Sequence, residues 1–312
     1  MRRINRTVLI LITFFTLNGT VAAQQNAQFS QHVFNSLVLN PAYAGSRNLV
    51  AATALYRNQW VGIEGAPKTV RFTMDAPLSS ERIGLGFQVG SDKAGITNST
   101  NFILSGAYRI PLSKGSFSFG LQGSMNNHYA AFSSVNPDPS ASIPDQAFSS
   151  DVNKSLFNFG SGIYYNTERF YIGFSVLDFV ANRLNIHAID TDDIIARQRA
   201  HVYLTSGYVF PVGTDLDLKT SIIFKEVRGA PVQGDINATL WIKQMIAIGA
   251  GYKTGADISA LIEVRITPQI RLGYAYDKSI TALRNYNSGS HEFMLRYEFS
   301  SDRSKTLSPR YF

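Results

Sequence analysis

The 312-residue chain carries 29 Lys and Arg against 22 Asp and Glu, and its charged fraction is 16%, compared with roughly 25% in an ordinary soluble domain. Aromatic residues reach 12% and cysteine is absent, which excludes disulfides, thiolate chemistry and a lipid anchor on cysteine. A soluble globule with so few charges and so many aromatic residues would have difficulty keeping its surface hydrated.

The N-terminal 23 residues have the pattern of a secretory signal peptide. Three arginines flank the start of an apolar run at 8–17, and the small residues at 21–23 predict cleavage before Gln24. The run is too short for a spanning helix, and the alternative is a retained N-terminal anchor. Removing three arginines lowers the formal charge from +7 to +4 (7 − 3), too small an excess to indicate nucleic-acid binding. We therefore expect an exported protein.

After the signal, apolar and polar residues alternate along the chain. In FSFGLQGSMNNHY (117–129), Phe119 and Leu121 fall on one parity, and Ser118 and Gln122 fall on the other. A period of two indicates β-strands, with one face toward lipid and the other toward a watery lumen. No apolar run after Gln24 approaches the roughly 20 residues of a membrane helix, so a membrane location would require strands.

Turn residues divide the chain into about 14 such segments. We expect strands at 47–60, 67–78, 82–92, 98–111, 115–130, 155–166, 168–178, 198–211, 215–228, 232–242, 244–254, 256–266, 269–280 and 290–299. Most of them reach the roughly 9–11 residues that a tilted strand needs to cross a bilayer.

The connections between these segments alternate in length. Every second one is tight, such as LSKG (112–115), whereas 131–154 and 179–197 are long. Short turns on one side, long loops on the other and an even strand count are typical of outer-membrane barrels. We therefore predict an all-β fold, a transmembrane antiparallel β-barrel of about 14 strands with both termini periplasmic. A soluble β-sandwich or jelly roll is the alternative.

Aromatic residues near the expected strand ends would supply interfacial girdles. They are Tyr56, Trp60, Tyr129, Tyr208, Tyr252, Tyr276 and Phe299. Trp241 falls on the inward parity, so either a bulge precedes it or the strand phase differs there.

The inward parity of the later strands is charged. The residues concerned are Lys219, Lys225, Glu263, Arg265, Arg271, Asp277, Glu292, Arg296 and Glu298. Mixed signs on neighbouring strands would form cross-strand ion pairs that fill a wide lumen. A ring for selectivity or partner contact is the alternative.

The chain offers no catalytic, cofactor or metal motif. Its five histidines are scattered without ligand spacing, and the acidic run at 190–193 reads as a solvated loop. GLGFQVG (84–90) lies in an expected strand with no helix after it, so it is not a phosphate loop. Because nothing groups a serine with a base and an orienting residue, an outer-membrane hydrolase is the weakest alternative.

Four long stretches carry a family resemblance. They are QFSQHVFNSLVLNPAYAGS (28–46), ALYRNQWVGIEGAPKTVRFTMDAPL (54–78), GAPVQGDINATLWIKQMIAIGAGYKTGADISALI (229–262) and LGYAYDKSITALRNYNSGSHEFMLRYEF (272–299). The chain resembles the PorP/SprF family of Bacteroidota, outer-membrane proteins of the type IX secretion system. This resemblance implies a barrel without enzymatic activity or cofactor. Such a barrel supports export or surface anchoring of a large secreted protein, including gliding adhesins, and some members are linked to the periplasmic ring lipoprotein.

With this resemblance, the expected organisation is a signal peptide at 1–23, a periplasmic lead segment at 24–46, a barrel at 47–299 and a periplasmic tail at 300–312. Expected partners are the secretion machinery, a secreted cargo or adhesin, and outer-membrane lipid. Candidate partner contacts are Asn40, Pro41, Tyr43, Gly45, Arg303, Lys305 and Arg310. The alternatives are a turn or a lumen plug for 40–45 and a solvated tail. A passive diffusion channel is the alternative function.

Overall fold

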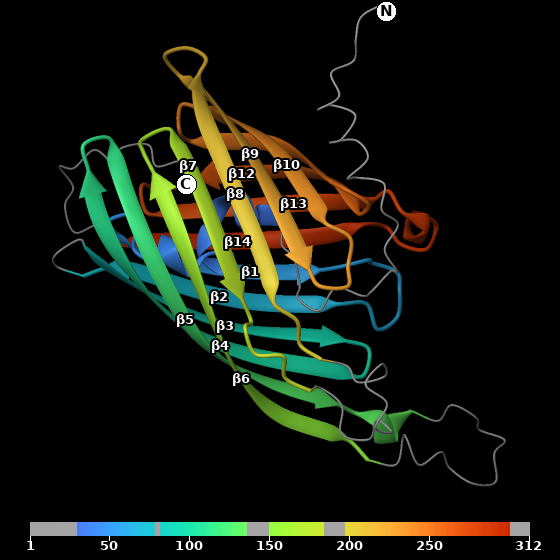
Figure 1. The fold of residues 1–312 in the computed structure, drawn as a ribbon. Coiled ribbons are helices and arrows are strands. Elements are labelled where there is room, and N and C mark those ends of the chain that lie inside the picture. Colours follow the sequence, from blue (N-terminus) through green and yellow to red (C-terminus); the bar gives the residue numbers. More distant parts are fainter. Residues whose placement is uncertain (1–29, 79–81, 136–149, 184–196, 300–312) are drawn as a thin grey trace, which may run out of the picture.

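Fourteen antiparallel strands close into a single barrel in the computed structural model, which describes residues 30–78, 82–135, 150–183 and 197–299 (Figure 1). Each strand pairs with its neighbours in sequence, and β1 (Val50–Asn58) closes the sheet on β14 (Ser290–Phe299). The closure leaves no free sheet edge, which a sheet surrounded by hydrocarbon requires. Among the described residues, no helix is long and apolar enough to cross a membrane.

The remaining strands follow in chain order. They are β2 (Lys68–Pro77), β3 (Ile83–Ala94), β4 (Thr97–Leu112), β5 (Gly115–Ala130), β6 (Val152–Asn166), β7 (Phe170–Leu177), β8 (His201–Pro211), β9 (Leu216–Val227), β10 (Gln233–Ile242), β11 (Ile246–Lys253), β12 (Asp257–Arg265) and β13 (Ile270–Ser279). All 14 strands confirm the sequence prediction, and every boundary agrees to within three residues.

The alternation in the sequence becomes two faces of one wall. In β5, Phe119 and Leu121 on the outside are 49% and 71% exposed, whereas Ser118 and Gln122 on the inside are 0% and 6% exposed. A surface with this many exposed large apolar side chains is suited to acyl chains rather than to water.

The two rims of the barrel differ. One rim, here called the short-turn rim, carries tight connections such as 113–114 and 243–245. The opposite rim, here called the long-loop rim, carries the connections 131–151 and 178–200. Val50 pairs with Phe299, so the barrel begins and ends at the short-turn rim.

The expected lead segment does not lie apart from the barrel. Residues 30–47, here called the plug, form the 3₁₀ turns η1 (Ser30–Phe34), η2 (Ser36–Val38) and η3 (Pro41–Tyr43) inside the lumen (blue in Figure 1). The apolar core of the molecule therefore lies between the plug and the inward side chains of the wall, where Leu37, Ala42 and Ala44 are fully buried.

Trp241 resolves a doubt about strand phase. It points into the lumen and is 5% exposed, and β10 pairs with β9 and β11 in continuous register. The inward parity was therefore right and no bulge intervenes. The indole packs edge-on against Phe34 of the plug, with the ring centroids 6.1 Å apart.

Candidate functional site

The plug and the wall that surrounds it form the most elaborate polar site in the described chain. The plug starts beside Asp277 and Glu292, which lie near the long-loop ends of β13 and β14. It ends at the short-turn rim, where the amide of Gly45 donates to Asp75 at 3.0 Å. The plug therefore runs through the lumen from one half of the barrel to the other.

A buried charge cluster holds the first residues of the plug. Arg57 of β1 forms ion pairs with Asp277 at 2.5 Å and with Glu292 at 3.0 Å. The carboxylate of Glu292 also accepts the backbone amides of Ser30 at 3.0 Å and of Gln31 at 2.8 Å. Hydrogen bonds to a charged acceptor are the stronger kind, and here they satisfy amides at the start of a helical turn.

A second cluster joins Phe34, in the middle of the plug, to Arg47 at the end of the plug. Arg47 donates to the Phe34 carbonyl at 2.8 Å and pairs with Glu298 at 3.2 Å, and Arg296 donates to the same carbonyl. The hydroxyl of Tyr43 accepts from Arg47 at 2.7 Å. Burial acts to lower the pKa of Arg47, but the fields of Tyr43 and Glu298 outweigh it, so the pKa is raised and the guanidinium stays charged.

The sequence NPAYAG (40–45) builds the last turn. Asn40 caps η3, since its side-chain oxygen accepts the Ala42 amide at 2.9 Å, and Pro41 takes the first position, where no amide is needed. The Asn40 amide group also donates to the Ile163 carbonyl of β6 at 2.9 Å. Gly45 has φ +67°, a conformation that favours glycine.

Inward-facing glycines give this turn its space. A Cβ added at these positions would overlap the plug: 1.9 Å from the Ala44 oxygen at Gly84, 2.1 Å from the Ala42 nitrogen at Gly120 and 2.2 Å from Asn40 Oδ1 at Gly162. A Cβ at Gly84 or Gly120 would therefore displace the backbone of the plug, and a Cβ at Gly162 would displace the Asn40 side chain. We refer to these three glycines as the glycine socket.

Four of the expected partner contacts lie inside the barrel. Asn40, Pro41, Tyr43 and Gly45 are all buried within the barrel, so a partner outside it cannot touch them in this conformation. Of the alternatives for residues 40–45, this location favours the lumen plug. Arg303, Lys305 and Arg310 lie outside the described residues.

The expected lumen-facing charges lie on the inner side of the wall. Exposure is at most 3% for Lys219, Glu263, Asp277, Glu292 and Arg296, whereas Arg265 and Arg271 are half-buried.

Only part of this set forms the cross-strand pairs expected from the sequence. Arg271 pairs with Glu263 of the next strand at 3.0 Å and lies over the Trp241 ring, 5.5 Å from its centroid. Glu292 pairs with Arg57, its direct partner on β1, and also binds the plug. Asp277 binds Arg57 and the plug, and Arg296 binds the plug. The charges therefore line a filled interior rather than an open ring.

Several residues of the site were not identified from the sequence. Arg57 and Asp75 face inward on β1 and β2, as their parity alone would show. The glycine socket and Arg47 carry no such signal, because their roles depend on contacts made by the plug.

The polar groups of this site anchor the plug to the barrel wall. Within the described ranges, no group of three or more His, Asp or Glu side chains could hold a metal ion. The buried carboxylates and guanidinium groups described above bind one another or the plug.

Solved structures share the architecture at low identity. The crystal structure of the Ralstonia pickettii toluene transporter TbuX matches with a TM-score of 0.50 at 9% identity, over 84% of this chain and 92% of that one. A Pseudomonas aeruginosa FadL homologue matches with a TM-score of 0.49 at 12% identity, over 86% and 94% of the two chains. The Acinetobacter baumannii outer membrane protein Omp33 matches with a TM-score of 0.48 at 9% identity, over 81% and 98%. At these identities the likeness concerns the barrel fold alone.

Family membership comes from the sequence itself. No curated protein matches the chain. The sequence profile described as "Type IX secretion system membrane protein PorP/SprF" matches residues 21–297, nearly the whole chain after the expected cleavage site. This match agrees with the resemblance noted in the sequence and with an outer-membrane barrel of the Gram-negative type. The chain therefore belongs to the PorP/SprF family of type IX secretion system membrane proteins.

Proposed function

We propose that this protein is a plugged, non-enzymatic scaffold of the outer membrane that supports export or surface anchoring of a large secreted protein. In this role the long-loop rim faces the cell exterior and meets the cargo. The short-turn rim, where the barrel begins and ends, faces the periplasm and the ring of the secretion machine. Residues 1–23 act as the signal that directs the chain to the periplasm.

The single observation that carries this proposal is the occupied lumen of a family member. Phe34, Leu37, Ala42, Tyr43 and Ala44 are each at most 3% exposed inside the barrel. A diffusion channel needs a continuous aqueous path, and a plug seated on backbone-close glycines argues against one. The secretion role needs outer surfaces and loops rather than a pore.

Deletion of the gene, followed by comparison of surface-exposed proteins, tests the secretion role. We expect loss of one or more type IX cargo proteins from the cell surface, and complementation with the full chain restores them. Normal display of every cargo, including any encoded beside this gene, would contradict the proposal. A very long secreted protein encoded next to the gene would point to cargo pairing.

Conductance in planar bilayers tests the channel alternative. The purified full chain is expected to give no steady open pore, because the plug occupies the lumen. A persistent, partner-independent conductance from the unmodified protein would favour the diffusion channel instead.

A further inference from the structure

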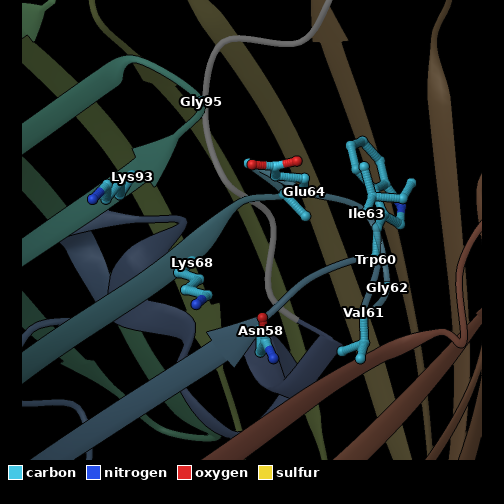
Figure 2. Close-up of a pocket in the computed structure, with 11 residues that line it drawn as sticks. Asn58, Trp60, Val61, Gly62, Ile63, Glu64, Lys68, Lys93 and Gly95 are labelled. Carbon is cyan, nitrogen blue, oxygen red and sulfur yellow. The ribbon is translucent and has the colours of Figure 1, made fainter.

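The loop between β1 and β2 encloses a cavity at the long-loop rim that the secretion role does not explain. The cavity has a volume of about 450 Å³ and is lined by residues 60–66 of this loop together with Asn58, Lys68, Lys93 and Gly95 (Figure 2). Backbone hydrogen bonds hold the loop in place: Val61 donates to Gly289 at 2.8 Å, and Gly95 donates to Gly65 at 2.8 Å. The cavity is therefore built into the rim.

Two unpaired cations stand side by side at this cavity. Lys68 of β2 and Lys93 of β3 are direct cross-strand partners, and both are exposed on the outer face. Neither ammonium has an ion-pair partner within the described part of the chain. The neighbouring Asp92 faces the other way and accepts from Thr69 at 2.7 Å. Like charges directly opposite each other repel, so a negative group between them would stabilise the pair.

The backbone of the loop adds further donors. Gly62, Glu64 and Gly65 line the same cavity, and their backbone amides donate no hydrogen bond to any described residue. Gly62 and Gly65 have φ values of +103° and +73°. Unpaired amides in a turn of this kind form anion-binding concavities. Among the described residues of the lining, Glu64 is the only acid, and it is exposed.

The apolar band begins directly below the lysines. On the same outer face, Val70, Phe72 and Phe87 are 54%, 36% and 37% exposed. A ligand held by the lysines would thus have its remaining atoms over the surface that contacts acyl chains. Long cationic side chains at the edge of an apolar band are placed for lipid headgroups.

We propose that this rim cavity binds the phosphate of a membrane lipid headgroup. Lys68 and Lys93 supply the charge, and the free amides of the loop supply directed hydrogen bonds. The acyl chains of the same lipid lie along β2 and β3. This assignment does not depend on which cargo the protein serves.

The test uses the full chain, freed of bound lipid in detergent, with three probes: diphosphoryl lipid A, the same lipid without phosphates, and inorganic phosphate. Native mass spectrometry reports retained lipid, and the heat-induced mobility shift on SDS gels reports stability. Diphosphoryl lipid A should bind and raise the midpoint of the shift. K68Q/K93Q should bind roughly 30-fold more weakly, since each lysine near an anionic lipid surface contributes about five-fold.

Two further variants separate this site from general surface charge. K114Q/K278Q removes two exposed lysines elsewhere and should leave lipid binding unchanged. E64Q removes the acid in the cavity lining and should strengthen binding several-fold. The proposal is overturned if K68Q/K93Q retains lipid like the unmodified protein or if K114Q/K278Q loses as much. Equal binding of the dephosphorylated lipid, or equal protection by inorganic phosphate alone, would overturn the lipid assignment.

Discussion

The two walls of the barrel hold the plug by different means. The wall of β1, β13 and β14 uses charge, because Glu292 accepts two backbone amides and is itself paired with Arg57. The wall of β3 to β6 uses space, because Gly84 and Gly120 let the backbone of the plug approach closely and Gly162 leaves room for the Asn40 side chain.

The difference follows from what each end of the plug lacks. The amides of Ser30 and Gln31 come at the start of a turn and have no partner within it, so the wall must supply an acceptor. The turn η3 satisfies its own groups through the Asn40 cap and the bond from Ala44 to Pro41 at 3.2 Å. Beside η3 the wall therefore only has to provide space for the turn.

Removal of Arg57 from the charged wall should cause the largest loss of stability. R57M leaves the buried carboxylates of Asp277 and Glu292 without their cation, which should cost about 3–5 kcal/mol in the free energy of unfolding. Urea unfolding of the full chain in detergent measures this cost. The exposed Arg228 provides the control, since R228M should change little.

A triple variant sharpens this prediction. R57M/D277N/E292Q removes all three charges of this cluster, so neither carboxylate is left as a buried charge without Arg57, and much of the lost stability should return. A triple variant less stable than R57M alone would show that the cluster does not act through charge compensation.

The glycine wall can be broken by one methyl group. G120A places a Cβ 2.1 Å from the Ala42 nitrogen, so η3 must move, at a cost of about 1–3 kcal/mol. Bilayer conductance should rise at the same time, because the plug no longer fits. The matched control is G106A on the adjacent strand, where a Cβ meets nothing within 4 Å. If both variants behave alike, the socket does not position the plug.

A smaller loss of stability is expected from the aromatic contact between Phe34 and Trp241, which depends neither on charge nor on glycine. Phe34 packs edge-on against Trp241, and F34L should lose about 1 kcal/mol of unfolding free energy with the aromatic contact. The control F87L changes an exposed aromatic residue on the lipid face and should cost less. A change in Trp fluorescence confined to F34L would confirm that the indole senses the plug.

The smallest effect on stability is expected for Asp151, which lies in a connection at the long-loop rim. Asp151 accepts hydrogen bonds from the hydroxyls of Ser133 and Tyr129, both at 2.7 Å, and these bonds lower its pKa. The contribution is therefore present above about pH 4 and lost at lower pH. At neutral pH, D151N should speed protease cleavage of the adjacent connection without changing global unfolding. No change in cleavage would contradict a role for Asp151 in holding this segment.

The strands were predictable because their signal is local. A strand exposes its two faces alternately, so the parity of Phe119 and Ser118 can be read from neighbouring letters. The same rule gave the right side for Trp241 and for the charged residues of the later strands. The number of strands followed from the turns between them.

The plug was only one of several alternatives for residues 40–45. Its decisive contacts join distant parts of the chain: the Ser30 amide bonds to a residue 262 positions later. For residues 40–45 a turn, a partner contact and a lumen plug therefore all remain open until the wall is seen around them.

Alternation along each segment was enough to predict strands with one apolar and one polar face, because each strand needs only its own residues to present two faces. Closure of the sheet and what fills its interior depend on contacts between distant segments. What fills the interior was settled by the folded chain. The role of an inward glycine such as Gly120 depends on the plug backbone that approaches it, which the local sequence does not show. Burial of Arg57 is stable only beside Asp277 and Glu292, which closure of the barrel brings to it.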